Sequence, residues 1–248
     1  MEKYPIGYKF TTHQQIQATI IDRVRSREKS CNILIEFNDR HKTQKWVEGL
    51  KVKTKHIQDP SLICHYNKFI AYKEDIKINP LAYMKYRAML DRCYGNQTGN
   101  NKTYKNCQVC DEWIQFENFV KWFNDNYYSI DNCSMDLDKD ILGNGKLYSP
   151  DTCVFIPHKL NSQFARRKEN KRLHSELPTG VFLHKRPSGA YCYRVTILPK
   201  KQLFENIQEA KQAYDSFVEN QYKEFALKYK EIIPQKLYEV LINYHFEK

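Results

Sequence analysis

Four of the eight cysteines have the composition of a metal site. Cys107 and Cys110 form a Cys-x-x-Cys pair, and Cys133 and Cys153 follow downstream. Four thiolates are the ligand set of a tetrahedral structural Zn²⁺ site. The sequence holds no second Cys-x-x-Cys pair, however, and buried free cysteines are common. Two interpretations therefore stay open, a zinc site and packing of the thiols in a core, and the spacing favours the core.

The middle third of the chain contains a longer ordered set of residues. Its first half is Tyr86, Met89-Leu90-Asp91-Arg92-Cys93-Tyr94, Tyr104-Lys105-Asn106-Cys107-Gln108-Val109-Cys110-Asp111-Glu112-Trp113, Phe116 and Phe119. Its second half is Leu137-Asp138-Lys139-Asp140, Asn144, Tyr148-Ser149-Pro150, Cys153 and Asn161. In this order and spacing, residues 80 to 165 resemble the HNH, or His-Me finger, nucleases that phages and mobile introns carry. The Tyr-Ser-Pro-x-x-Cys segment is the most specific part of the resemblance.

The resemblance implies a β-β-α finger that holds one divalent metal ion against the scissile phosphate. This chemistry needs an oxygen or imidazole ligand, a base that activates water, and a helix residue that completes the metal shell. By similarity, Asp138 is a ligand of Mg²⁺ or Mn²⁺, and Asn161 or His158 is its partner on the helix. Asn144 would orient groups in the turn between the two strands.

One position departs from the family pattern. Active members carry the general-base histidine after the first acidic residue, where this chain has Lys139. A lysine is protonated near neutral pH unless it is strongly desolvated, so it is a poor base for activating water. Asp140 could replace the missing base, or His158 could approach from the helix. The third alternative is an inactive finger that is kept as a scaffold for DNA.

Positive charge is concentrated between residues 166 and 201. This stretch has ten Lys or Arg residues against Glu169 and Glu176, so it carries +8 of the net +11. Aromatic residues alternate with the charges, which is typical of a basic sheet laid on phosphates, although a solvated charged face is the alternative. The expected nucleic-acid contacts are Arg166, Arg167, Lys168, Arg172, Lys185, Arg186, Tyr191, Tyr193 and Arg194.

The last third carries a second resemblance. Its residues are Gly180-Val181, Tyr191-Cys192-Tyr193-Arg194-Val195, Leu203-Phe204, Glu209-Ala210 and Ala213-Tyr214. They resemble the plant APETALA2-type DNA-binding domain, a three-stranded sheet backed by a helix. The resemblance implies a sheet that enters the major groove, with Arg186, Tyr191, Tyr193 and Arg194 directed at bases and phosphates. Leu203, Phe204 and one face of the helix are expected in the core.

The elements that must position these residues indicate an α+β fold with three parts. Residues 1–62 indicate a small β-barrel-like unit with a structural or docking role. Residues 63–172 indicate helices near 80–93 and 117–123, then a strand-turn-strand-helix finger over 135–164. Residues 173–248 indicate a three-stranded sheet, a packed helix over 207–217 and a short terminal helix.

Composition narrows the classes of function. A net charge of +11 and a pI near 9.1 favour a polyanionic partner, here double-stranded DNA. No apolar run approaches the roughly 20 residues that cross a bilayer, and no phosphate-binding glycine loop or nucleophile elbow is present. We therefore expect neither membrane insertion nor a nucleotide cofactor. The first ten residues lack the apolar stretch of a signal peptide, so a cytoplasmic location is expected, in the host cell if a phage encodes the chain.

Three functions remain open at this point. The first is a metal-dependent HNH-type endonuclease that cleaves or nicks duplex DNA. The second is a catalytically inactive finger protein that binds nucleic acid as a phage accessory or anti-defence factor. The third is a factor whose main target is a host protein. Lys139 favours the second and third, whereas the basic, aromatic stretch favours the first and second.

Overall fold

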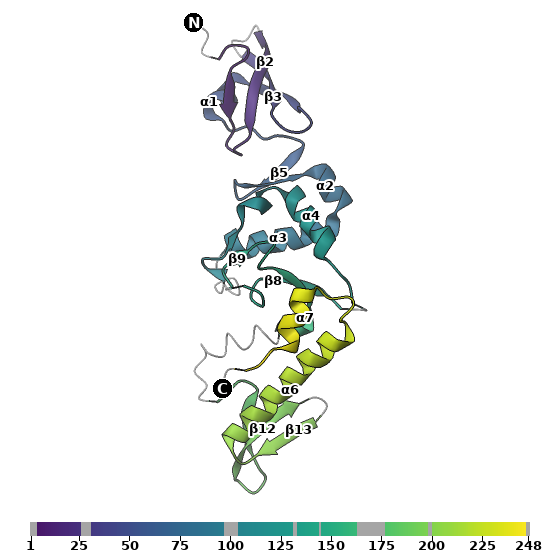
Figure 1. The fold of residues 1–248 in the computed structure, drawn as a ribbon. Helices are drawn as coiled ribbons and strands as arrows, with labels where there is room; N and C mark the ends of the chain where they lie inside the picture. Colours follow the sequence, from purple (N-terminus) through teal and green to yellow (C-terminus); the bar gives the residue numbers. More distant parts are fainter. Residues whose placement is uncertain are drawn as a thin grey trace. The chain divides into compact units, whose positions relative to one another are not determined.

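The computed structural model of the chain describes residues 4–25, 31–96, 104–130, 133–143, 145–162, 177–197 and 200–246. These residues form a mixed α+β protein with several small sheets, so the expected fold class is confirmed (Figure 1). The chain divides into two compact units, residues 1–125 and 126–248. The boundary expected after residue 62 falls inside the first unit, and the one expected after residue 172 lies outside the described ranges.

The first unit begins with a four-stranded antiparallel sheet in the order β1-β2-β3-β4. Its strands are β1 (Lys9–Thr11), β2 (Gln17–Arg25), β3 (Cys31–Phe37) and β4 (Gln44–Glu48), and α1 (Gly49–Thr54) follows. Alternate residues of β3, namely Ile33, Ile35 and Phe37, are buried on one face, as the two-residue period of a strand requires. Within the described residues, hydrogen bonds do not join β1 to β4, so the barrel-like unit is an open sheet.

The rest of the first unit is built around aromatic side chains. The hairpin β5 (Leu62–His65) and β6 (Phe69–Tyr72) leads into α2 (Lys73–Ile78) and α3 (Pro80–Tyr94). The short strand β7 (Gln108–Val109), a 3-10 helix (Asp111–Ile114) and α4 (Phe116–Asn126) follow. Tyr86, Trp113 and Phe119 are fully buried, and the Tyr86 hydroxyl donates to the Trp113 carbonyl at 2.7 Å. Both helices expected here are confirmed, and Pro80 occupies the first turn of α3.

A buried histidine links the β5–β6 hairpin to α3. His65 Nε2 lies 2.9 Å from the Tyr83 hydroxyl, and His65 Nδ1 lies 2.9 Å from the Arg87 guanidinium. Because a guanidinium only donates, Nδ1 accepts and Nε2 carries the proton, which makes the ring neutral. Burial, together with the charge of Arg87, lowers the pKa of His65 to about 4.

The second unit contains the expected finger. Strands β8 (Met135–Asp138) and β10 (Val154–Pro157) pair antiparallel, with β9 (Leu147–Tyr148) between them in sequence. Residues 158–162 are helical. The strand-turn-strand-helix order predicted for this stretch is therefore confirmed.

A three-stranded antiparallel sheet completes the second unit. Its strands are β11 (Val181–Lys185), β12 (Tyr191–Ile197) and β13 (Lys200–Phe204), in that order. Helix α6 (Ile207–Lys228) lies along this sheet, and α7 (Gln235–Ile242) follows (Figure 1). Gly180, which precedes β11, has a φ of 79° and lies against the Tyr214 ring, so a side chain at this position would collide with the ring.

Helix α6 extends well past the predicted end at residue 217, because it serves two cores. Its first half packs on the sheet, where Ala210 contacts Val181 and Val195. Its second half places Val218, Tyr222 and Ala226, at four-residue spacing, in a core that also contains residues of α7 and of the finger strand β10. The finger and the C-terminal sheet are thus attached to one helix. In the described parts of the chain, no helix combines the length and apolar character needed to cross a bilayer.

His65 makes the stability of the first unit depend on pH. The pKa of His65 is about 4 in the folded protein, against 6.5 ordinarily, so its contribution is complete above pH 6.5 and is lost as the pH falls toward 4. Between pH 6.5 and pH 4, we expect the free energy of unfolding to fall by about 3 kcal/mol more in the wild type than in His65→Gln. All three tryptophans lie in this unit, so urea unfolding followed by tryptophan fluorescence at both pH values measures the difference. Equal losses in the two proteins would show that another group is responsible.

Candidate functional site

Asp138 holds the turn that leaves β8. Its Oδ1 accepts hydrogen bonds from the backbone amides of Asp140 and Ile141, both at 2.8 Å, and the residue is buried. Burial raises the pKa of this carboxyl, and the two backbone hydrogen bonds oppose the shift. Asp138 is thus engaged with the backbone of its own turn, and its predicted role as a metal ligand stays a prediction.

Lys139 and Asp140 form an ion pair beside the same turn. The Lys139 side chain is almost completely buried, and its Nζ lies 3.1 Å from Asp140 Oδ2. The same ammonium lies 5.4 Å from the centre of the Tyr148 ring. An ammonium that is paired with a carboxylate has protons to donate and no lone pair to accept one. Neither Lys139 nor its partner is therefore arranged as a free base.

The finger gathers its polar side chains around a different residue, Asp136. Asp136 Oδ2 accepts from His158 Nδ1 at 2.7 Å and from Asn161 Nδ2 at 3.1 Å. Asp136 and Asp138 are two residues apart on β8 and share a face of the strand. His158 and Asn161 are three apart and share a face of the helix. The structure therefore brings two predicted site residues together on a carboxylate that the sequence analysis missed.

This cluster has the geometry of a general base with an orienting carboxylate. Since a carboxylate only accepts, His158 Nδ1 donates to Asp136, so in the neutral ring the lone pair lies on Nε2. The His158 side chain is 68% exposed, whereas that of Asp136 is 19% exposed, so the imidazole faces solvent from a largely buried support. A neutral imidazole held in this way has the arrangement of a general base toward water.

The same cluster offers oxygen atoms to a metal ion. Asp136 Oδ1 and Asn161 Oδ1 make no hydrogen bond to another described residue. Oxygen is the ligand that Mg²⁺ prefers, and Mg²⁺ commonly takes one or two protein ligands together with water and substrate phosphates. Among the residues that the structure describes, no group of three or more His, Cys, Asp or Glu side chains is close enough together to hold a metal ion alone. The donor set therefore fits a metal ion shared with a phosphate.

The four cysteines of the predicted zinc site differ in their exposure, and among the described residues they form no group that could hold a metal ion. Cys107 and Cys153 are buried, Cys110 is half-buried and Cys133 is exposed, and no disulfide joins any of the four to a described cysteine. Burial raises the pKa of Cys110, which favours the thiol over the thiolate that Zn²⁺ requires. The described residues thus give the zinc interpretation no support.

The face of the C-terminal sheet that lies away from α6 carries a mixed basic and apolar row. Arg194 pairs across the strands with Phe182 on one side and Leu203 on the other. Phe182 and Leu203 are 49% and 47% exposed, and the Arg194 guanidinium lies 5.6 Å from the centre of the Phe182 ring. Arg194 Nε has no hydrogen-bond partner among the described residues. We call Phe182, Arg194 and Leu203 the outer row.

The other predicted contact residues are placed in different ways. Lys185 lies 5.8 Å from the ring of its cross-strand neighbour Tyr191, which is 60% exposed. Arg186 is ion-paired with Glu205. Tyr193 packs partly buried in the core cluster beneath α6. Arg166, Arg167, Lys168, Arg172 and Asn144 lie outside the described residues.

Leu203 corrects one expectation of the sequence analysis. It was expected in the core with Phe204, but its register with Arg194 places it on the outer face, where it is exposed. Phe204 pairs with Tyr193 and packs in the core cluster beneath α6 as expected. Two adjacent strand residues necessarily face opposite sides of the sheet.

Comparison of the chain with protein-family models, curated proteins and solved structures found no match.

The hydrogen bonds of Asp138 predict a structural effect that Asp136 does not share. Asp138→Ala removes the acceptor of two backbone amides and should lower the free energy of unfolding by about 1–3 kcal/mol. Asp138→Asn keeps a carbonyl oxygen at the same position and should retain most of that stability. Asp136→Ala should cost less than Asp138→Ala, because the Asp136 partners are exposed or half-buried. Urea unfolding followed by far-UV circular dichroism tests this order, and a larger loss in Asp136→Ala would contradict it.

Proposed function

We propose that this chain binds double-stranded DNA through the outer face of the β11–β13 sheet and cleaves or nicks the bound duplex at the finger. The observation that carries the proposal is the outer row, where an arginine with an unsatisfied Nε lies between two exposed apolar side chains. The Nε atom is buried, so a phosphate or base edge would be met by the exposed part of this half-buried side chain. The sequence pattern of an APETALA2-type sheet supports the same surface.

The net charge supports a polyanionic partner. The formal charge of +11 attracts DNA over a distance set by the ionic strength, and phosphate contacts then position the sheet. Lys185 and Tyr191, at the end of the β11–β12 hairpin, place a cation beside an exposed ring, although their register puts them on the opposite side of the sheet from the outer row. Arg186 contributes after its exposed ion pair with Glu205 opens, which costs little at the surface.

The Asp136, His158 and Asn161 cluster supports cleavage. A divalent Mg²⁺ or Mn²⁺, when bound, would supply charge to the phosphate oxygens and to the leaving oxygen. Asp136 and Asn161 would hold it through the side-chain oxygen atoms that make no hydrogen bond to described residues. His158 Nε2 would take a proton from water while the water oxygen bonds to phosphorus and the bond from phosphorus to the leaving oxygen breaks. Asp136 fixes the ring orientation during this transfer.

The buried ion pair of Lys139 supports the alternative, a finger that binds nucleic acid without cutting it. Lys139 is at the position where the resembling nucleases carry their general base, and its buried ammonium is ion-paired with Asp140. In this alternative, His158 and Asn161 only connect the helix to β8, and the protein acts as an accessory or anti-defence factor.

A plasmid assay separates cleavage from binding alone. Purified wild-type protein should nick supercoiled plasmid in Mg²⁺ or Mn²⁺ and not in EDTA. His158→Ala should reduce the rate by about 10²-fold or more, because it removes the base. His245→Ala, which changes another exposed histidine of the same unit, should retain full activity. Metal-independent nicking, or equal rates in both variants, would remove the finger chemistry and leave the binding role.

The salt dependence of DNA binding tests the sheet. Arg194→Ala should weaken duplex binding and reduce the slope of log K against log salt concentration by about 1, as expected for one lost phosphate contact. Lys51→Ala changes an exposed lysine on α1 of the first unit and should leave the slope unchanged. Gel-shift titrations at several salt concentrations measure both, and identical slopes for the two variants would place the interface elsewhere.

A further inference from the structure

The outer row exposes apolar surface on the face of the C-terminal sheet that lies away from α6. Phe182 on β11 and Leu203 on β13 are 49% and 47% exposed, and neither belongs to the core cluster beneath α6. Leu183, the neighbour of Phe182 on the same strand, is also exposed, but it points to the opposite side of the sheet. Two large apolar side chains therefore lie in solvent on the surface that is proposed to meet DNA.

The sheet holds these two side chains at a defined separation. Arg194 pairs with Phe182 on one side and with Leu203 on the other, so the two apolar residues are two strands apart. Neighbouring strands lie about 4.8 Å apart, which separates Phe182 from Leu203 by roughly 10 Å. This distance corresponds to about three base-pair steps of duplex DNA, at roughly 3.4 Å each. The two side chains can therefore contact bases within one short site.

Cations flank the outer row on both sides. Lys201, which is exposed, is two residues before Leu203 on β13, and Arg186 is four residues after Phe182, just beyond β11. Even spacing along a strand puts both cations on the outer face. Because β11 and β13 are each antiparallel to β12, they run in the same direction, and the two cations lie on opposite sides of the row. Apolar groups in the middle with positive charge on either side match a duplex groove, where base edges lie between two phosphate backbones.

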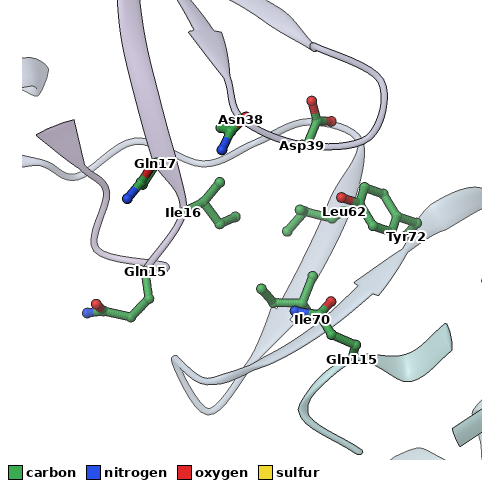
Figure 2. A pocket seen from close by; sticks show the side chains of 9 residues that line it. All are labelled: Gln15, Ile16, Gln17, Asn38, Asp39, Leu62, Ile70, Tyr72 and Gln115. Carbon is green, nitrogen blue, oxygen red and sulfur yellow. The ribbon is translucent and has the colours of Figure 1, made fainter. Parts of the chain in front are cut away.

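Apolar groups without such charges indicate no occupant by themselves. A cavity of about 230 Å³ in the first unit is an example, where Ile16 and Ile70 lie in the wall together with three glutamines and Asp39 (Figure 2). None of the described residues that line this cavity is Lys or Arg, so a phosphate would meet only a carboxylate there. The flanking cations distinguish the outer row from this cavity and assign the row to a polyanion.

We propose that Phe182 and Leu203 contact the C5-methyl groups of two thymines in the major groove, so that the outer row selects DNA sites by the positions of thymine. The thymine methyl is the only methyl group that the four standard bases present in the major groove, and apolar side chains contact it. The minor groove presents no such group. This inference rests on the DNA binding proposed above and adds sequence selectivity to it. Arg194 keeps its proposed role as the cation between the two apolar contacts.

Removal of the methyl group alone tests the proposal on the full chain. The wild-type protein first selects a duplex site from random-sequence DNA in EDTA, where a metal-dependent finger cannot cleave the probe. Each thymine of the site is then replaced by deoxyuridine, which keeps every hydrogen-bonding group of the base and lacks only the methyl. At two positions no more than about three base-pair steps apart, the replacement should weaken binding by about 4-fold, as the loss of one buried methyl group predicts.

Variants of the sheet identify the side chains that make the contacts. Leu203→Ala should abolish the effect of deoxyuridine at one of the two positions, and Phe182→Ala should abolish it at the other. Neither variant should change the slope of log K against log salt concentration, because no charge is lost. Leu183→Ala truncates an exposed side chain on the opposite face of β11 and should keep both effects. Each comparison of thymine with deoxyuridine is made within one variant, so it does not depend on the stability of that variant.

The outcomes separate this inference from the DNA binding on which it rests. The methyl contacts would be overturned, and DNA binding kept, if the wild type bound DNA but enriched no site or bound the thymine and deoxyuridine sites equally. Unchanged deoxyuridine effects in both Phe182→Ala and Leu203→Ala would have the same meaning. Tighter binding to 5-methylcytosine than to thymine at the two positions would overturn thymine as the source of the methyl groups. Absence of binding to any duplex would overturn both proposals.

Discussion

The second unit depends on the burial of one continuous stripe along α6. Ala210 packs beneath the sheet, and Val218, Tyr222 and Ala226 continue the same helix into the core that contains Val154 and Ile156. A two-stranded finger buries too little apolar surface to be stable alone. Because α6 contributes to the core beneath the sheet and to the core that contains β10, it gives the finger's side chains a fixed support. The orientation of His158 against Asp136 follows from this support, because β10 leads directly into the helix that carries the imidazole.

The sequence predicts the elements of this protein better than it predicts their side-chain partners. Pro80 and the spacing of Leu81, Tyr86 and Leu90 predict α3, and the turn residues near 143–145 predict the finger hairpin. The C-terminal end of α6 was harder to predict, because the second half of the helix packs in the core that contains β10 rather than on the sheet. The apolar residues of this half have four-residue spacing in the sequence, so a longer helix was predictable from the same periodicity.

The sequence pattern does not predict which side chains meet in the candidate site. Asp136 and Asp138 occupy the same face of β8, and their sequence context alone does not say which meets the helix. Backbone amides decide this. The amides of the turn after β8 donate to Asp138, so Asp136 is the carboxylate that accepts from His158 and Asn161. Likewise, Leu203 and Phe204 are both apolar, and only the register with β12 decides that Leu203 faces outward.

The length of α6 also sets a distance between the sheet and the finger, which matters if both contact DNA as proposed. Ala210, under the sheet, and Tyr222, against the finger, are separated by about 18 Å of helix at a rise of 1.5 Å per residue. Along B-form DNA that distance corresponds to roughly five base-pair steps of 3.4 Å. If the sheet binds the duplex and the finger acts on it, α6 fixes the distance between the two contacts. The position of a cut relative to the bound sequence would then follow from helix geometry.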